Sequence, residues 1–316
     1  MNERQNGRQP KSDLLPIGSV VRRLQETHPS VSQSSLRFLE REGLIEPTRT
    51  PGGHRLYSEA DIERIQQIKA WQDQRLSLDQ IRERLEQRDR LPHPGDLADG
   101  FLQLILSAQL ADARALLLHA DSLGMPLAAL FGEVLQPVLY EVGLRWEDGR
   151  MLVAQEKETS ELARDLIAEL SQRHDATQPD GPSLVAGSVQ GERHELGLRM
   201  ISGLLRSRGC RVHYLGADVA HEFFIEAVEL HQPDAVLISV KLEANVEQVG
   251  AAAERIRAAL AADPAPPILA GGEAVASSAD HLRQRGVYPI VDTTLDGVID
   301  TVMGKLPSSA IGQDVI

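Results

Sequence analysis

The sequence predicts a multidomain protein with a helical amino-terminal module, a four-helix bundle, and an α/β domain built on a doubly wound, parallel, five-stranded sheet. Linkers containing proline and glycine at 91–95 and 175–181 separate the three parts, because these residues interrupt regular structure. Apolar residues recur at helical spacing through 96–174, whereas strand-like apolar runs alternate with helical segments after residue 181. With 316 residues, 42% of them hydrophobic, the chain can bury more than one core.

Charge is distributed unevenly along the chain. Residues 1–90 contain 16 Lys and Arg against 14 Asp and Glu, a net charge of +2, whereas the remainder contains 17 against 32, a net charge of −15. An acidic surface repels nucleic acid, so contact with DNA is expected only in the first part. The chain has no apolar run of about 18 residues and no apolar signal-like segment near Met1, and its single Cys210 cannot form an internal disulfide. These features predict a cytoplasmic protein without a membrane partner.

The amino-terminal module is expected at 15–90, after a flexible tail at 1–14. Its pattern predicts four helices with a turn-rich segment at 51–57, and Ser58 and Ser77 are plausible helix caps. The predicted helices span 17–24, 32–42, 58–74 and 77–88. The bundle is expected at 96–174, where breaks near 124–126 and 148–149 divide the chain into about four helices.

The α/β domain is expected at 181–306, followed by a tail at 307–316. Five apolar runs alternate with five helical segments, which predicts a parallel sheet. The predicted strands span 184–189, 211–215, 235–240, 267–270 and 288–291, and the predicted helices lie near 195–208, 220–231, 245–261, 274–285 and 294–305. A sheet of strand order 2-1-3-4-5 binds ligands between strands 1 and 3, beyond their carboxyl ends.

Three distinctive turns are predicted to meet at this crevice. His194 follows the first strand, Ser239 lies at the end of the third, and Gly271-Gly272 follows the fourth. An imidazole beside glycines suits a large planar ligand that carries a metal, since glycines let a ligand approach the backbone closely. For His194 taken alone, the alternative is an exposed side chain in an ordinary strand-to-helix loop.

These turns resemble the cobalamin-binding domain of methionine synthase and methylmalonyl-CoA mutase. The family pattern is Asp/Glu-x-His-x-x-Gly, then Ser-x-Leu or similar, then Gly-Gly. Residues 192–197 and 271–272 agree with it, whereas 239–242 departs at Lys241, where the family commonly has Leu or Thr, so Lys241 is given no role. The resemblance implies that His194 is the lower axial ligand of cobalt, that Glu192 orients its imidazole, and that Ser239 hydrogen-bonds the nucleotide base. The glycines are expected to leave room for the nucleotide tail. The residues expected to contact the cofactor in this domain are Glu192, His194, Gly197, Ser239, Val240, Gly271 and Gly272.

The bundle resembles that of CarH/LitR-type photoreceptors, through the motif Trp-x₉-Glu-His. The resemblance implies adenosylcobalamin as the cofactor, with Trp146 over its upper axial group and Glu156 in contact with the ribose. Lys157 stands where the family has the His that binds cobalt after light breaks the cobalt–carbon bond. An ammonium group has no lone pair, so this capture of cobalt is not expected here. For Trp146 taken alone, the alternative is a residue of the bundle core.

The amino-terminal module resembles the MerR family, whose fold is a winged helix-turn-helix. The helix at 32–44 and the wing at 52–57 carry the resemblance. It implies that this helix enters the major groove, where Arg37 and Arg41 lie one turn apart, and that the wing grips the neighbouring backbone. The alternative is that the two arginines pair with Glu40 and neighbouring residues on a solvated face. The residues expected at DNA are Ser34, Ser35, Arg37, Arg41, His54 and Arg55.

Together these features predict a cobalamin-binding transcriptional regulator rather than an enzyme. We expect a repressor that binds double-stranded promoter DNA and whose oligomerisation is set by adenosylcobalamin. With Lys157 in place of the family's His, two alternatives stay open: a response to light that differs from that of the family, and sensing of cobalamin without light. Because Pro92 and Pro94 follow the DNA module, the homo-oligomer, a dimer or tetramer, is expected to form through the other two domains. One alternative is a MerR-type regulator with a modified or lost cobalamin response, controlled by a protein partner. A corrinoid-dependent enzyme or carrier is a second alternative.

Overall fold

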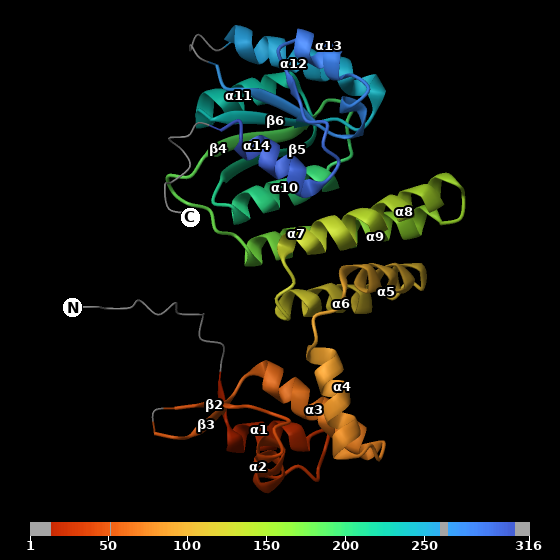
Figure 1. Ribbon diagram of the computed structural model, residues 1–316, viewed down its shortest axis with the longest axis vertical. Coiled ribbons are helices and arrows are strands. Elements are labelled where there is room, and N and C mark those ends of the chain that lie inside the picture. Colours follow the sequence, from red (N-terminus) through yellow and green to blue (C-terminus); the bar gives the residue numbers. More distant parts are fainter. Residues whose placement is uncertain (1–13, 51, 260–264, 307–316) are drawn as a thin grey trace, which may run out of the picture. The chain divides into compact units, whose positions relative to one another are not determined.

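A computed structural model describes residues 14–50, 52–259 and 265–306 of the chain (Figure 1). The chain divides into two compact units, Met1–Arg90 and Leu91–Ile316, so the bundle and the α/β domain belong to one unit. The expected fold class, a winged helix-turn-helix module, a helical bundle and a doubly wound parallel sheet, is confirmed. Apart from Leu14, the tails expected at 1–14 and 307–316 lie outside the described residues.

The first unit contains four helices and a small antiparallel sheet of strand order β1-β3-β2. The helices begin where the sequence predicts, because Ser32, Ser58 and Ser77 each form a capping box with the residue three positions later. The sequence did not predict the strands, since two or three residues show no usable alternation. The elements are β1 (Leu15–Pro16), α1 (Ile17–Gln25), α2 (Gln33–Arg41), β2 (Thr48–Arg49), β3 (Arg55–Tyr57), α3 (Glu59–Asp73) and α4 (Leu78–Asp89).

The bundle contains α5 (Pro94–Leu106), α6 (Leu110–Ser122), a continuous helix Leu127–Glu147, and α9 (Val153–Arg173). Pro94, expected to interrupt a helix, instead begins α5, because the first helical position needs no N–H donor. The continuous helix comprises α7 (Leu127–Ala129), the π-helical η1 (Leu130–Leu135) and α8 (Gln136–Glu147). Pro137 cannot donate to the carbonyl four residues earlier, which accounts for the π-helical turn before it.

The helix Leu127–Glu147 is the one candidate membrane span in the described part of the chain, by length and composition alone. Its buried side chains, which include Leu130, Phe131, Val134, Leu135, Val138 and Val142, belong to the apolar core that the bundle shares with the sheet. Apolar residues at helical spacing that face such a core are sufficient to explain its hydropathy.

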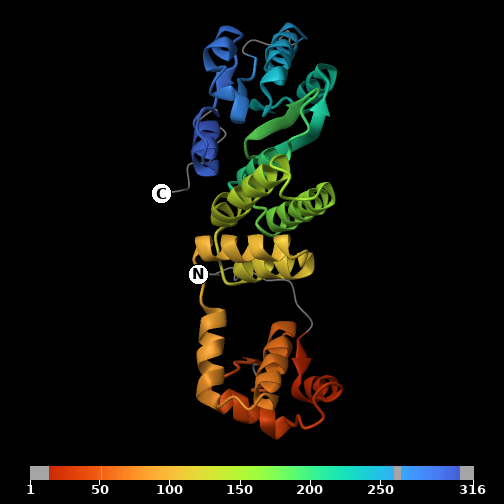
Figure 2. The ribbon, with the colours of Figure 1, turned by 90° about the vertical axis from the view of Figure 1, so that its right-hand side faces the viewer.

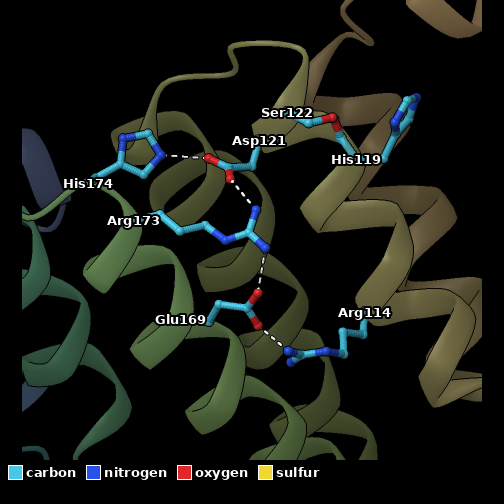
Figure 3. Close-up of polar contacts among 7 residues, drawn as sticks. All are labelled: Arg114, His119, Asp121, Ser122, Glu169, Arg173 and His174. Atoms are coloured by element: carbon cyan, nitrogen blue, oxygen red, sulfur yellow. Dashed lines mark hydrogen bonds and ion pairs between the residues drawn. The ribbon is translucent and has the colours of Figure 1, made fainter. Parts of the chain in front are cut away.

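A polar network fastens α9 to α6 (Figure 3). Glu169 of α9 accepts from Arg114 of α6 and, at 2.6 Å, from Arg173. Arg173 also donates to Asp121 at 3.1 Å, and the other oxygen of Asp121 lies 2.6 Å from Nε2 of His174. Since Asp121 is largely buried, this network holds the carboxyl-terminal end of α9 firmly within the bundle.

The second unit continues with a parallel sheet of order β5-β4-β6-β7-β8, which is the predicted order 2-1-3-4-5. Helices α10 and α14 cover the face toward the bundle, and α11 and α12 cover the other face (Figures 1 and 2). The helix predicted at 274–285 is divided into a 3₁₀ turn and a short helix. The elements are β4 (Ser183–Val189), α10 (Leu196–Ser207), β5 (Arg211–Val219), α11 (His221–His231), β6 (Ala235–Ser239), η2 (Glu243–Asn245), α12 (Val246–Ala259), β7 (Ile268–Gly271), η3 (Glu273–Val275), α13 (Ala279–Gln284), β8 (Tyr288–Pro289) and α14 (Leu295–Met303).

The alternation of side chains along the strands decides what faces the bundle. Leu184 and Ala186 of β4 lie in the core on the bundle side, whereas Val185 and Val189 lie in the opposite core. Successive strand residues point to opposite faces, so Ser188 at the end of β4 faces the bundle side. Ser188 is in register with Ser239, which is in register with Gly271. The carboxyl ends of three adjacent strands therefore present small residues on one face.

Candidate functional site

The imidazole of His194 is held by a buried carboxylate. Nδ1 of His194 lies 2.6 Å from Oε1 of Glu192, which also accepts from the His194 backbone N–H at 3.1 Å. Glu192 is fully buried, whereas the His194 side chain is 49% exposed. With a proton on Nδ1 bound to Glu192, the lone pair of Nε2 is available to a ligand outside the sheet.

Glu192 is also bound to the loop that follows β6. Its Oε2 accepts from the backbone N–H groups of Lys241 and Leu242, both at 2.9 Å, and from Asn245 at 3.3 Å. Burial by itself would raise the pKa of Glu192, but the hydrogen bonds from Leu242, His194 and Lys241 outweigh it and lower the pKa to about 2. The group is therefore a carboxylate at neutral pH, and it links the turns after the first and third strands of the predicted site.

A hydroxyl group without a partner lies at the same sheet edge. Ser188 is fully buried, and its Oγ makes no hydrogen bond. A buried polar group without a partner is costly, and ligand-binding sites are places where such groups occur. Ser239 is in register beside it and is partly exposed. The sequence did not single out Ser188, because only the register of β4 and β6 shows which face its side chain occupies.

The predicted glycines have different roles. A Cβ at Gly197 or Gly271 would meet nothing within 4 Å, so both positions border open space, as a slot for a ligand requires. Gly272 has a φ of +120°, and a Cβ there would lie 2.2 Å from the carbonyl oxygen of Val240. The neighbouring strand itself therefore requires a glycine at this position, and the expectation that Gly272 also makes room for a ligand stays a prediction.

Val240 reaches this edge only through its backbone. Its side chain is fully buried in the core on the opposite face of the sheet, while its N–H donates to the carbonyl of Gly271 at 2.9 Å. The structure thus brings Val240 to the strand ends but directs its side chain away from the face that presents Ser188 and Ser239. Its contribution is to fix the backbone of Gly271 and Gly272.

The bundle residues predicted to cover the cofactor lie on α8 and α9. Trp146 is 45% exposed, so it is not a core residue of the bundle, which excludes the alternative stated above. Glu156 lies in the first turn of α9 and accepts from Ser160 at 2.8 Å. Lys157 Nζ lies 3.1 Å from Oε2 of Glu156, and the Lys157 side chain is exposed. The ammonium group is therefore paired with the carboxylate expected to contact the ribose.

On the DNA module, α2 presents exposed cations. Arg37 is exposed, and Arg41 packs its guanidinium 5.3 Å above the ring centroid of Phe38. Glu40 pairs with Arg49 and Arg55 of the wing strands, at 2.6 and 2.5 Å, rather than with Arg37 or Arg41. Glu40 therefore joins the wing to α2 and does not pair with the helix arginines. Nε of Arg41 instead lies 3.6 Å from Oε1 of its neighbour Glu42, so the alternative holds for Arg41 with a neighbouring carboxylate but not with Glu40.

Three further residues predicted at DNA differ in their freedom to bind it. Ser34 and His54 are exposed. Ser35 uses its hydroxyl in the capping box, where it donates to the Ser32 carbonyl at 2.7 Å and accepts from the Ser32 N–H. Its hydroxyl is therefore occupied in the described structure.

Comparison with known proteins agrees with this arrangement. Family profiles match at residues 17–88 for the MerR HTH family regulatory protein, and at residues 97–171 and 182–296 for B12 binding domains. Over 257 residues the chain is 32% identical to the HTH-type transcriptional repressor CarH of Myxococcus xanthus, and the match covers 75% of this chain and 83% of that protein.

The chain belongs to the CarH family. The repressor CarA of the same organism is 28% identical over 262 residues, covering 80% of this chain and 85% of CarA. Both relatives are transcriptional repressors, so this CarH-family chain is a transcriptional regulator with a MerR-type DNA-binding module and B12-binding domains. The predicted family is thereby confirmed.

A solved structure shares the fold of the second unit. The monomethylamine corrinoid protein of Methanosarcina barkeri covers 66% of this chain and 98% of its own length, with a TM-score of 0.56 and 17% sequence identity. At this identity the likeness concerns the fold, not the function.

Proposed function

We propose that this protein is a transcriptional repressor that binds adenosylcobalamin, with His194 as the lower ligand of cobalt, and that the bound cofactor sets its oligomeric state and DNA binding. The observation that carries the proposal is the pair of Glu192 and His194. A fully buried carboxylate fixes Nδ1 of an imidazole that is about half exposed, and Nε2 has no protein partner assigned to it here. Imidazoles that ligate metals are commonly oriented in this way.

The residues around His194 suit the remainder of the cofactor. The unpaired hydroxyl of Ser188, the neighbouring Ser239, and the open space at Gly197 and Gly271 would hold the displaced nucleotide tail on the bundle side of the sheet. Trp146 and Glu156 would cover the upper face from the bundle. When bound, the cofactor supplies a cobalt–carbon bond that light breaks, while the chain binds it and orients it.

We further propose that position 157 supplies no ligand to cobalt. Nζ of Lys157 is paired with Glu156 at 3.1 Å, and an ammonium group in such an ion pair has no lone pair to offer cobalt. Loss of the upper group would then leave His194 as the one protein ligand that we assign to cobalt. The response to light in this chain would differ from that of relatives with a His at this position.

DNA binding is assigned to α2 and the wing of the first unit, with Arg37, Arg41 and Arg55 toward the phosphates and bases. Two or more copies of this module in one homo-oligomer bind a promoter more tightly than one, because the second contact becomes intramolecular. We propose that the homo-oligomer, a dimer or tetramer, forms through the second unit, and that the protein acts in the cytoplasm. This assignment gives the chain no catalytic role.

Light scattering coupled to size exclusion tests the proposal. The full chain is measured in the dark without corrinoid, with adenosylcobalamin, and after green light, and binding to promoter DNA is followed in parallel. We expect a larger assembly and tighter DNA binding with adenosylcobalamin, and no such change for His194→Ala. If the molecular mass and the DNA affinity are the same with and without adenosylcobalamin, and no corrinoid is retained, the alternative of a regulator controlled by a protein partner is favoured. Turnover of a methylated or acyl-CoA substrate would instead indicate a corrinoid enzyme or carrier.

A further inference from the structure

Glu195 directly follows His194 and begins α10, yet its carboxylate does not cap that helix. Acidic residues at helix starts usually bind the free N–H groups of the first turn. Here the side chain is 12% exposed and is directed to other elements. Because a partly buried carboxylate needs hydrogen-bond partners and this one does not bind the N–H groups of its own helix, its partners are expected on more distant segments.

Three partners surround Glu195, and they come from three elements. Tyr214 of β5 donates its hydroxyl to Oε2 at 3.0 Å, and Arg164 of α9 donates Nε to Oε1 at 3.0 Å. Arg199 on α10 forms an ion pair without a hydrogen bond, its Nε lying 3.2 Å from Oε2. The Arg199 guanidinium also packs 4.9 Å above the ring centroid of Tyr214. Arg199 and Tyr214 belong to the sheet domain, whereas Arg164 belongs to the bundle.

The Arg164 side of this contact is fixed to the body of the bundle. Arg164 also pairs with Glu161, one turn earlier on α9. Two turns beyond Arg164, the network of Figure 3 ties α9 to α6 through Glu169, Arg173 and Asp121. A displacement of the bundle would therefore carry Arg164 with it.

The two carboxylates that flank His194 thus act on different structures. Glu192 ties the histidine loop to the loop after β6, inside the sheet domain. Glu195 ties the same loop to α9, the helix whose first turn carries Glu156 and Lys157. One short segment is therefore bound both to the sheet edge and to the bundle helix that covers it.

We propose that the ion pair of Glu195 and Arg164 is a latch that couples the position of the bundle to the loop carrying His194. Glu195 and Arg164 are positioning residues: neither is assigned to touch the cofactor, and they act through His194 and α9. The coupling to cofactor binding rests on the proposed function, whereas the mechanical link between bundle and loop does not. Because coupling is reciprocal, a latch that holds the bundle also favours binding at His194.

Paired spin labels test the latch without any cofactor. One label is placed on α6 at Ala115→Cys and the other on α11 at Leu230→Cys, both exposed sites, while the native Cys210 is buried and stays unlabelled. Glu195→Gln and Arg164→Gln remove the bundle link, and Arg199→Gln is the matched control that removes a partner of Glu195 within the sheet domain. We expect a single narrow distance distribution for the parent and for Arg199→Gln, and a broadened or shifted one for the two latch variants.

Binding of hydroxocobalamin, followed by its absorbance, gives the second readout. Glu195→Gln and Arg164→Gln should each weaken binding about fivefold or more, the double variant should be no weaker than either single variant, and Arg199→Gln should stay within about twofold. The latch proposal is overturned if both latch variants keep the distance distribution of the parent. It is also overturned if Arg199→Gln changes the distances and the affinity as much as Glu195→Gln and Arg164→Gln do. Failure of the parent to bind hydroxocobalamin would overturn the proposed function instead, and the distances would still decide the latch.

Discussion

Substitution of Gly272 by alanine should destabilise the second unit, whereas the same substitution at Gly271 should not. At Gly272, φ is +120°, which L side chains rarely adopt, and the added Cβ would lie 2.2 Å from the Val240 carbonyl oxygen. At Gly271 the added Cβ meets nothing within 4 Å. The two adjacent positions are therefore a matched pair that differ in backbone conformation and in the space beside them.

The magnitude follows from two costs at Gly272. A residue other than glycine in this backbone region costs about 1–3 kcal/mol. Displacing the backbone of Val240 adds a further strain of about 1–3 kcal/mol. We expect Gly272→Ala to lower the free energy of unfolding by about 2–6 kcal/mol, and Gly271→Ala to change it by less than about 1 kcal/mol.

Urea unfolding of the full chain measures both effects. The chain has two tryptophans, Trp71 and Trp146, so Trp71→Phe leaves a fluorophore in the second unit alone. With a slope of about 2–3 kcal/mol per molar urea, the midpoint for Gly272→Ala should fall by about 1–3 M. Equal midpoints for the two variants would refute the conclusion that Val240 requires Gly272. If Gly271 borders the nucleotide slot, Gly271→Ala should instead weaken hydroxocobalamin binding about tenfold.

Three further predictions concern other parts of the chain. Glu192→Gln removes the carboxylate that fixes the imidazole and should weaken hydroxocobalamin binding about 10- to 100-fold in a spectral titration; an unchanged affinity would contradict the orienting role. Arg37→Ala should reduce the slope of log affinity against log salt for promoter DNA by about 0.9, and an unchanged slope would remove Arg37 from the phosphate contacts. Burial raises the pKa of the Cys210 thiol to about 11. The buried thiol therefore contributes fully to the free energy of unfolding below about pH 9, and this contribution is lost at higher pH because the thiol ionises in the unfolded chain first. By pH 11 the loss is about 2 kcal/mol. Urea unfolding should show this loss for the parent chain but not for Cys210→Ala. The same pH dependence in the parent and in the variant would contradict the raised pKa of Cys210.

The sequence predicted the fold closely because its signals are local. Capping serines, the linker prolines and the alternation of strands and helices all act within a few residues, and the predicted strand order follows from the general rule for such sheets. The strands β2 and β3 were not predicted because each has only two or three residues. Pro94 was wrongly placed in the linker, because a proline can either interrupt a helix or occupy its first position. The pairing of Glu192 with His194 could be predicted because the two residues lie two positions apart in one turn.

The remaining features depend on contacts between distant segments. Ser188 looks like any residue of a buried strand until the register with Ser239 gives its face and its lack of a partner. The pairing of Glu40 with Arg55 joins a helix to a wing 15 residues away, and the contact between Glu195 and Arg164 spans 31 residues. No periodicity in the sequence encodes such pairs, because they arise from how the elements pack.

The absorbance spectrum of the chain loaded with adenosylcobalamin in the dark, compared with that of His194→Ala, decides whether His194 ligates cobalt. If His194 replaces the nucleotide base beneath cobalt, the parent should retain the corrinoid through gel filtration with the spectrum of imidazole-ligated cobalt. The variant should lose the corrinoid or show it without a nitrogen ligand from the protein. Retention of the same spectrum by His194→Ala would contradict the assignment of His194.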